Sequence, residues 1–229
     1  SMAAQQGNDD AARSRYERSL AIRRRLGDRS NVANLLSNLG ILARRRGDRE
    51  AARVQHEESL TIRRELGDRR AIAGSLSNLG NLALDQGELA EARARLEEAV
   101  ALQRQVGDRT YIANALNNLG NVARAQGDYA GASGMYRESL TINRDLGDRW
   151  GIAYALEDIG CLAALEGQPR RAMRLVGAAD ALRQAIGAPL AANERTRLEQ
   201  SLEVCIAALG ERESEEAFAE GGSMALDQA

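Results

Sequence analysis

The sequence predicts an all-α protein, a right-handed solenoid of antiparallel helix pairs with a helical cap at its C-terminal end. An apolar residue followed by glycine returns every forty residues, and two further glycine series keep the same period. Such self-similarity is typical of stacked units that bury their apolar faces only against their neighbours. The composition agrees, since 44% of the residues are hydrophobic, 3% are aromatic and only two are proline. The repeated pairs are Leu39-Gly40, Leu79-Gly80, Leu119-Gly120 and Ile159-Gly160.

Residues 68–107 show how one unit forms its two helices. Asp68 can cap a helix whose apolar side chains recur at steps of three and four residues, and Gly87 ends it. Glu88 then opens a second helix that ends at Gly107. We therefore expect turns inside the units at Gly47, Gly87, Gly127 and Gly167, and between units at Gly27, Gly67, Gly107 and Gly147.

The order of small and apolar residues resembles the tetratricopeptide repeat family. A leucine precedes Leu-Gly, and a small residue, a turn glycine and two spaced alanines follow, as in residues 76–92. The family's usual unit has about 34 residues, whereas this one has forty, so we expect longer helices. The long unit is similar to the repeats of cargo-binding and cell-polarity adaptors. The resemblance covers residues 7–187.

The same alignment predicts the domain organisation. We expect an array over residues 7–187, made of a half repeat (7–27) and four units (28–67, 68–107, 108–147 and 148–187). Residues 188–229 should form truncated capping helices. The helix at 9–26 lacks a partner, so its strip of Ala12, Tyr16 and Leu20 should be exposed and could form a dimer.

The C-terminal part carries a second resemblance. "RLVGAADALRQAIGAPL" at 174–190, followed by "ER" and "EEAFAEG", is similar to the C-terminal repeat region of bacterial LuxR-type and cyclase-type regulators that contain an ATPase domain. This resemblance implies the sensory or assembly region of a larger signalling or transcriptional regulator.

The composition argues against several classes of function. Every basic residue is arginine, so Schiff-base lysines and phosphate-loop lysines are excluded, and the only histidine is His56. Cys161 and Cys205 have no metal-ligand spacing, which indicates reduced thiols in a cytoplasmic protein. The net charge of −2 argues against direct nucleic-acid binding. We expect no enzyme, no catalytic residue, no cofactor, no metal and no membrane segment.

The first helix of each unit should line a binding groove, as it does in the family that the chain resembles. Asn38, Asn78 and Asn118 recur before the Leu-Gly pair, and their amides suit the main chain of an extended peptide. Arg44, Arg45 and Arg124 could add selectivity for acidic side chains. The other candidate groove residues are Asn34, Ser37, Ile41, Ser77, Asn81, Asn114, Asn117, Asn121 and Tyr154.

Simpler interpretations stand beside these assignments. The asparagines could be a solvated feature of the repeat consensus, and the arginines a solvated charge run. His56 fits a packed core position, and Trp150 could serve either packing or a partner's footprint. Glu157 and Asp158 next to Tyr154 predict an acidic end of the groove.

Two functions follow from this sequence. The first is a non-catalytic scaffold that binds a protein or peptide segment along its groove through the asparagine row. The alternative is an intramolecular regulatory or self-association module of a parent protein.

Overall fold

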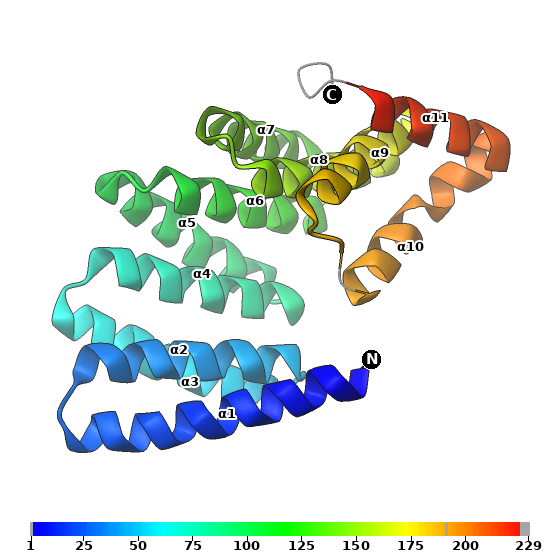
Figure 1. The fold of residues 1–229 in the computed structure, drawn as a ribbon. Helices are drawn as coiled ribbons and strands as arrows, with labels where there is room; N and C mark the ends of the chain where they lie inside the picture. Colours follow the sequence, from blue (N-terminus) through cyan, green and yellow to red (C-terminus); the bar gives the residue numbers. More distant parts are fainter. Residues whose placement is uncertain (1, 191, 225–229) are drawn as a thin grey trace. The chain divides into compact units, whose positions relative to one another are not determined.

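The computed structural model describes residues 2–190 and 192–224, with the side chains of residues 2–8, 192 and 193 left out (Figure 1). This described part contains eleven helices and no strand, so the predicted all-α fold is confirmed. The helices are α1 Met2–Arg25, α2 Arg29–Arg45, α3 Arg49–Leu66, α4 Arg69–Asp85, α5 Leu89–Val106, α6 Arg109–Ala125, α7 Tyr129–Leu146, α8 Arg149–Leu165, α9 Pro169–Ile186, α10 Ala192–Leu209 and α11 Glu211–Ser223.

The chain divides into two compact units, residues 1–108 and residues 109–229. The first unit holds α1 to α5, in which α2 packs on α3 and α4 packs on α5 as helix pairs. The second unit holds α6 to α11, in which α6 packs on α7 and α8 on α9. Within each unit, the second helix of one pair also contacts the first helix of the next, as α3 contacts α4 and α7 contacts α8.

Glycine turns and aspartate caps set the helix ends. The side chains of Asp48, Asp68, Asp128 and Asp148 accept a hydrogen bond from the third backbone N–H that follows, which satisfies a free donor of the first turn. Every expected turn glycine from Gly27 to Gly167 has a positive φ, which side chains with a Cβ rarely adopt. The expected turns are confirmed at these positions.

The glycine of each Leu-Gly pair allows the two helices of a pair to approach closely. A Cβ added at Gly40 would lie 2.6 Å from the His56 ring, and one added at Gly80 would lie 2.6 Å from Leu96. The Tyr136 ring packs against Gly120 in the same way, so that a Cβ added at Gly120 would collide with it. Whatever fills the position opposite the glycine therefore sets the packing of its pair.

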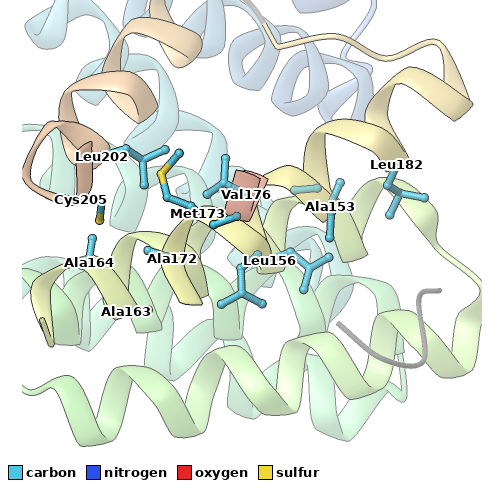
Figure 2. Packing of buried hydrophobic residues seen from close by; sticks show 14 of the residues in the cluster. Ala153, Leu156, Ala163, Ala164, Ala172, Met173, Val176, Leu182, Leu202 and Cys205 are labelled. Carbon is cyan, nitrogen blue, oxygen red and sulfur yellow. The ribbon is translucent and has the colours of Figure 1, made fainter. Parts of the chain in front are cut away.

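The apolar cores follow the predicted helix faces. In the first unit, Leu60, Leu76, Leu79 and Ala99 form one cluster between α3, α4 and α5. In the second unit the largest cluster joins α8, α9, α10 and α11, and Figure 2 shows Leu202 and Cys205 of α10 directed toward Met173 and Ala164. Within residues 188–229, where capping helices were expected, the structure has α10 and α11.

Helix α11 lies against α9 at backbone contact distance. A Cβ added at Gly177 of α9 would collide with the main-chain oxygen of Phe218, and one at Gly221 of α11 would collide with that of Arg174. The two glycines therefore hold the cap on the last repeat helix.

One expectation for α1 is wrong. The apolar strip is not exposed, since Leu20 is 9% exposed and Tyr16 packs against the same cluster with Val32, Leu36 and Leu39 of α2. The strip packs on the helix that follows, so it does not depend on a missing one.

Candidate functional site

In the first unit, part of the predicted asparagine row is bound by the protein itself. Asn34 Oδ1 accepts a hydrogen bond from the Arg63 guanidinium at 3.0 Å, and Asn78 Nδ2 donates to the Ser37 hydroxyl at 3.2 Å. Asn81 buries its Oδ1 without a partner. Asn38 is exposed, while Ser37 is buried and Ser77 is half-buried. The row here is a mixture of structural amides and free ones.

The arginines that were expected to select acidic partners already have acidic neighbours. Arg44 pairs with Asp85 at 2.6 Å, and Arg45 lies 3.5 Å from Asp9. Both guanidinium groups are partly solvated, so these pairs are weak and open to exchange. Ile41 next to them is 41% exposed.

In the second unit, several polar side chains predicted for the groove form a hydrogen-bond network around Asp158. Its Oδ2 accepts from Asn117 Nδ2 at 2.5 Å and from Asn121 Nδ2 at 3.4 Å, while Arg124 lies 3.7 Å from Oδ1. Asn121 Oδ1 in turn accepts from the Tyr136 hydroxyl at 2.8 Å. Burial raises the pKa of Asp158, and Arg124 and the two amides oppose that rise. Asn121 and Arg124 therefore serve mainly to compensate a buried carboxylate.

The expected acidic end of the groove is also wrong, because both carboxylates are neutralised internally. Glu157 is 8% exposed and accepts two hydrogen bonds from the guanidinium of Arg183. Burial raises the pKa of Glu157, and its hydrogen bonds with Arg183 oppose the rise. Arg183 also lies 5.5 Å from the centroid of the Tyr154 ring, whose other neighbour is Trp150 at 5.1 Å between centroids.

A pocket of about 160 Å³ opens between α6, α7 and α8, inside the second unit. Two of the residues that line it, Asn117 and Asn143, have a buried amide Oδ1 without a hydrogen-bond partner among the described residues. Unpaired buried acceptors are uncommon and costly, which marks the place as one where a donor is missing. The pocket is lined by Asn114, Asn117, Asn118, Ser139, Asn143, Trp150, Gly151 and Tyr154.

Five of the eight pocket residues were named from the sequence. Asn114, Asn117, Asn118 and Tyr154 were expected in the groove, and Trp150 was left open between packing and a partner's footprint. Asn143, Ser139 and Gly151 were missed, because they belong to the second helix and to the start of the next one. The signal that could have found Asn143 is a change of residue type in a series spaced by forty, which runs Arg63, Gln103, Asn143 and Arg183.

The described residues offer little for other chemistry. No group of three His, Cys, Asp or Glu side chains among them could hold a metal ion. None of the described helices combines the length and apolar character needed to span a bilayer. His56 is fully buried, and burial lowers its pKa to about 4, so it is neutral at pH 7.

Comparison with known sequences identifies the repeat. The tetratricopeptide repeat profile matches residues 1–65, 71–145 and 113–185. The chain belongs to the tetratricopeptide repeat family. Domains of this family generally bind protein partners and act as non-catalytic scaffolds, and their helix pairs stack as those of each unit do here. No curated protein sequence matches the chain.

Solved structures share the tetratricopeptide repeat fold. The crystal structure of BtubC (BKLC) from P. vanneervenii is similar with a TM-score of 0.74 and 21% identity, over 93% of this chain and 89% of that one. Pseudomonas aeruginosa pilF is similar with a TM-score of 0.50 and 18% identity, over 93% of this chain and 99% of that one. At these identities the likeness concerns the fold alone.

Proposed function

We propose that this tetratricopeptide repeat protein binds extended segments of partner proteins through amide side chains of its first helices. In residues 1–108 the amides are those of Asn38 and Asn78, and in residues 109–229 those of Asn114, Asn117 and Asn118. An amide offers both a donor and an acceptor, which matches the repeating N–H and C=O groups of an extended main chain. Binding of this kind needs no catalytic group.

The observation that carries the proposal is the pocket between α6, α7 and α8. Three asparagines of α6 line it, and Asn117 presents a buried Oδ1 that nothing within the described residues satisfies. A protein group left unpaired in this way costs about 1–3 kcal/mol, and a bound donor recovers that cost. The free state is thus prepared for a ligand that carries N–H groups.

Selection from a displayed library of random dodecapeptides on the purified full chain tests the proposal. We expect enrichment of peptides whose affinity drops when single backbone amides are N-methylated, since main-chain donors are then lost. Failure to enrich any peptide would contradict the proposal. So would enriched peptides whose affinity is insensitive to every N-methylation.

The resemblance of residues 174–190 supports a wider proposal, that the chain is the sensory or assembly region of a larger bacterial regulator. In that case the bound segment could belong to the same polypeptide, which is the intramolecular alternative. Sequencing the gene upstream of residue 1 tests the first point. An ATPase or output module in the same reading frame is expected, and an intergenic boundary there would contradict it.

A further inference from the structure

One position of the second helices changes residue type along the repeat. Arg63 of α3, Gln103 of α5, Asn143 of α7 and Arg183 of α9 are spaced by forty and so occupy the same place in their helix pairs. Arg63 and Arg183 are long and cationic, Gln103 is neutral, and Asn143 is neutral and the shortest of the four. The space that a guanidinium fills in α3 and α9 is therefore not filled by the side chain at this position of α7.

The two arginines define what that space offers. Arg63 donates to Asn34 Oδ1 at 3.0 Å and to the main-chain oxygen of Ala71 at 3.2 Å. Arg183 donates two hydrogen bonds to Glu157. The acceptors thus come from the first helix of the same pair and from the start of the following helix.

Most of the corresponding acceptor positions around Asn143 keep a polar group and line the pocket. Asn114 stands eighty residues after Asn34, Gly151 stands eighty after Ala71, and Asn117 stands forty before Glu157. Ser75, which accepts from Arg63 at 2.7 Å, is replaced at this place by Ala155, which has no side-chain acceptor. At this wall the Asn143 amide packs directly against Gly151, where an added Cβ would lie 2.6 Å from it. The volume of about 160 Å³ corresponds to roughly five waters in the liquid, enough for a guanidinium group.

The orientation of the buried amides makes the pocket an acceptor site. Asn117 Nδ2 donates to the Asp158 carboxylate, which can only accept, so Asn117 Oδ1 points elsewhere and has no partner. Asn143 Nδ2 faces the Ser139 hydroxyl at 3.4 Å, and its Oδ1 is also unpaired. Asn117 is 6% exposed and Asn143 is 2% exposed, so neither oxygen is satisfied by bulk solvent, and each amide must turn toward the pocket to meet a ligand.

We infer that this pocket binds the guanidinium of an arginine in the partner segment, in the place that Arg63 and Arg183 fill in their own helix pairs. The inference rests on the proposed function and names the side chain that the segment must carry. Trp150, 47% exposed, adds an aromatic face that attracts a planar cation, while the Tyr154 ring beside it already lies 5.5 Å from the Arg183 guanidinium. Lysine fits less well, because the separated acceptors suit the fixed fork of five guanidinium donors.

The chain carries its own reporter for this site. Trp150 is the only tryptophan, so its fluorescence reports on the pocket. We would titrate the full chain with the blocked peptide Ac-Ala-Ala-Arg-Ala-Ala-amide and with matched peptides that carry citrulline, lysine or norleucine instead. Citrulline keeps the shape of arginine without its charge. We expect a saturable change with arginine and at least fivefold weaker binding with each of the other three.

Amino-acid substitutions in the protein test whether the arginine of the peptide binds in the pocket between α6, α7 and α8. Asn143→Arg should fill the pocket from within and abolish the response, whereas Thr141→Arg adds the same charge at an exposed position of α7 and should not. Should Asn143→Arg fail to fold, Asn114→Ala removes one acceptor at an exposed residue and should weaken the arginine peptide at least threefold. Circular dichroism checks folding in each case.

The outcomes separate this inference from the proposed function. Equal responses to arginine and citrulline, no response to arginine, or an unchanged response in Asn143→Arg and Asn114→Ala would overturn it. Display-selected peptides that bind without any arginine would overturn it too, while the proposed function would stand. If the arginine peptide binds specifically but the display selection enriches no peptide, the arginine site stands and the proposed binding of extended segments is refuted.

Discussion

At the residue scale, burial of His56 lowers the stability of its helix pair. The ring is fully buried against Gly40 and neither nitrogen has a hydrogen-bond partner. Burial lowers its pKa from 6.5 to about 4, with the charges of Arg44 and Arg63 acting in the same direction. The unfolded chain therefore takes up a proton at a higher pH than the folded one.

The free energy of unfolding should consequently fall as the pH drops from 6.5 toward 4. Above about pH 8 the ring is neutral in both states and contributes nothing to the pH dependence. Between pH 8 and pH 5 we expect a loss of about 2 kcal/mol from this one group. Urea unfolding at a series of pH values measures it, with His56→Leu as the comparison.

The leucine variant should lack this slope and be more stable at pH 7. Leu96 fills the equivalent place opposite Gly80, so the side chain fits, and no unpaired ring nitrogen remains. We expect a gain of about 1–3 kcal/mol. A variant with the wild-type slope between pH 6.5 and 4 would show that His56 is not the group responsible.

The buried pair of Glu157 and Arg183 gives a second prediction at this scale. Arg183→Met should lower the free energy of unfolding by about 3–5 kcal/mol, because Glu157 is left as a buried carboxylate without its guanidinium. Chemical denaturation at pH 7 measures the loss. The double variant Arg183→Met with Glu157→Leu should recover most of it, and equal stability of the single and double variants would contradict this account.

At the scale of the elements, the sequence was sufficient for the helices and their turns. The repeat period, the capping aspartates and the turn glycines determine helix ends through local interactions. The helix ends predicted for residues 28–187 therefore agree with the structure. It was not sufficient for the groove, since hydrogen bonds between helices depend on rotamers. Asn117 and Asp158 illustrate this limit, because nothing in their spacing of 41 shows that one amide is committed to one carboxylate.

The contact of α9 with α11 yields a prediction at this scale. Gly177→Ala should reduce stability by about 1–3 kcal/mol, because the new methyl group meets the backbone of Phe218, which cannot move aside as a flexible side chain would. Thermal unfolding followed by circular dichroism measures it. Gly222→Ala is the matched control, since its Cβ would lie 3.7 Å from the nearest atom and stability should stay the same or rise. Equal effects of the two substitutions would refute the close contact.

At the scale of the whole molecule, repetition explains both the success and the limit of the sequence prediction. Each helix pair repeats one local solution, so the fold could be predicted from the forty-residue period and is shared with proteins about 20% identical. Function depends instead on where the repeat departs from itself. Asn143 in place of an arginine and Gly151 beside it are departures of this kind.

The affinity of a display-selected peptide for the chain with Asn78→Ala and Asn118→Ala tests the central proposal most directly. These amides lie on first helices, and Asn78 is seen to bond to the Ser37 hydroxyl alone among the described residues, so folding should be little affected. The paired control is Thr61→Ala with Thr141→Ala, two exposed residues on second helices. We predict a dissociation constant at least tenfold higher for the asparagine variant, with its melting temperature and the control's affinity unchanged. An unaltered dissociation constant in the asparagine variant would contradict main-chain recognition by these amides.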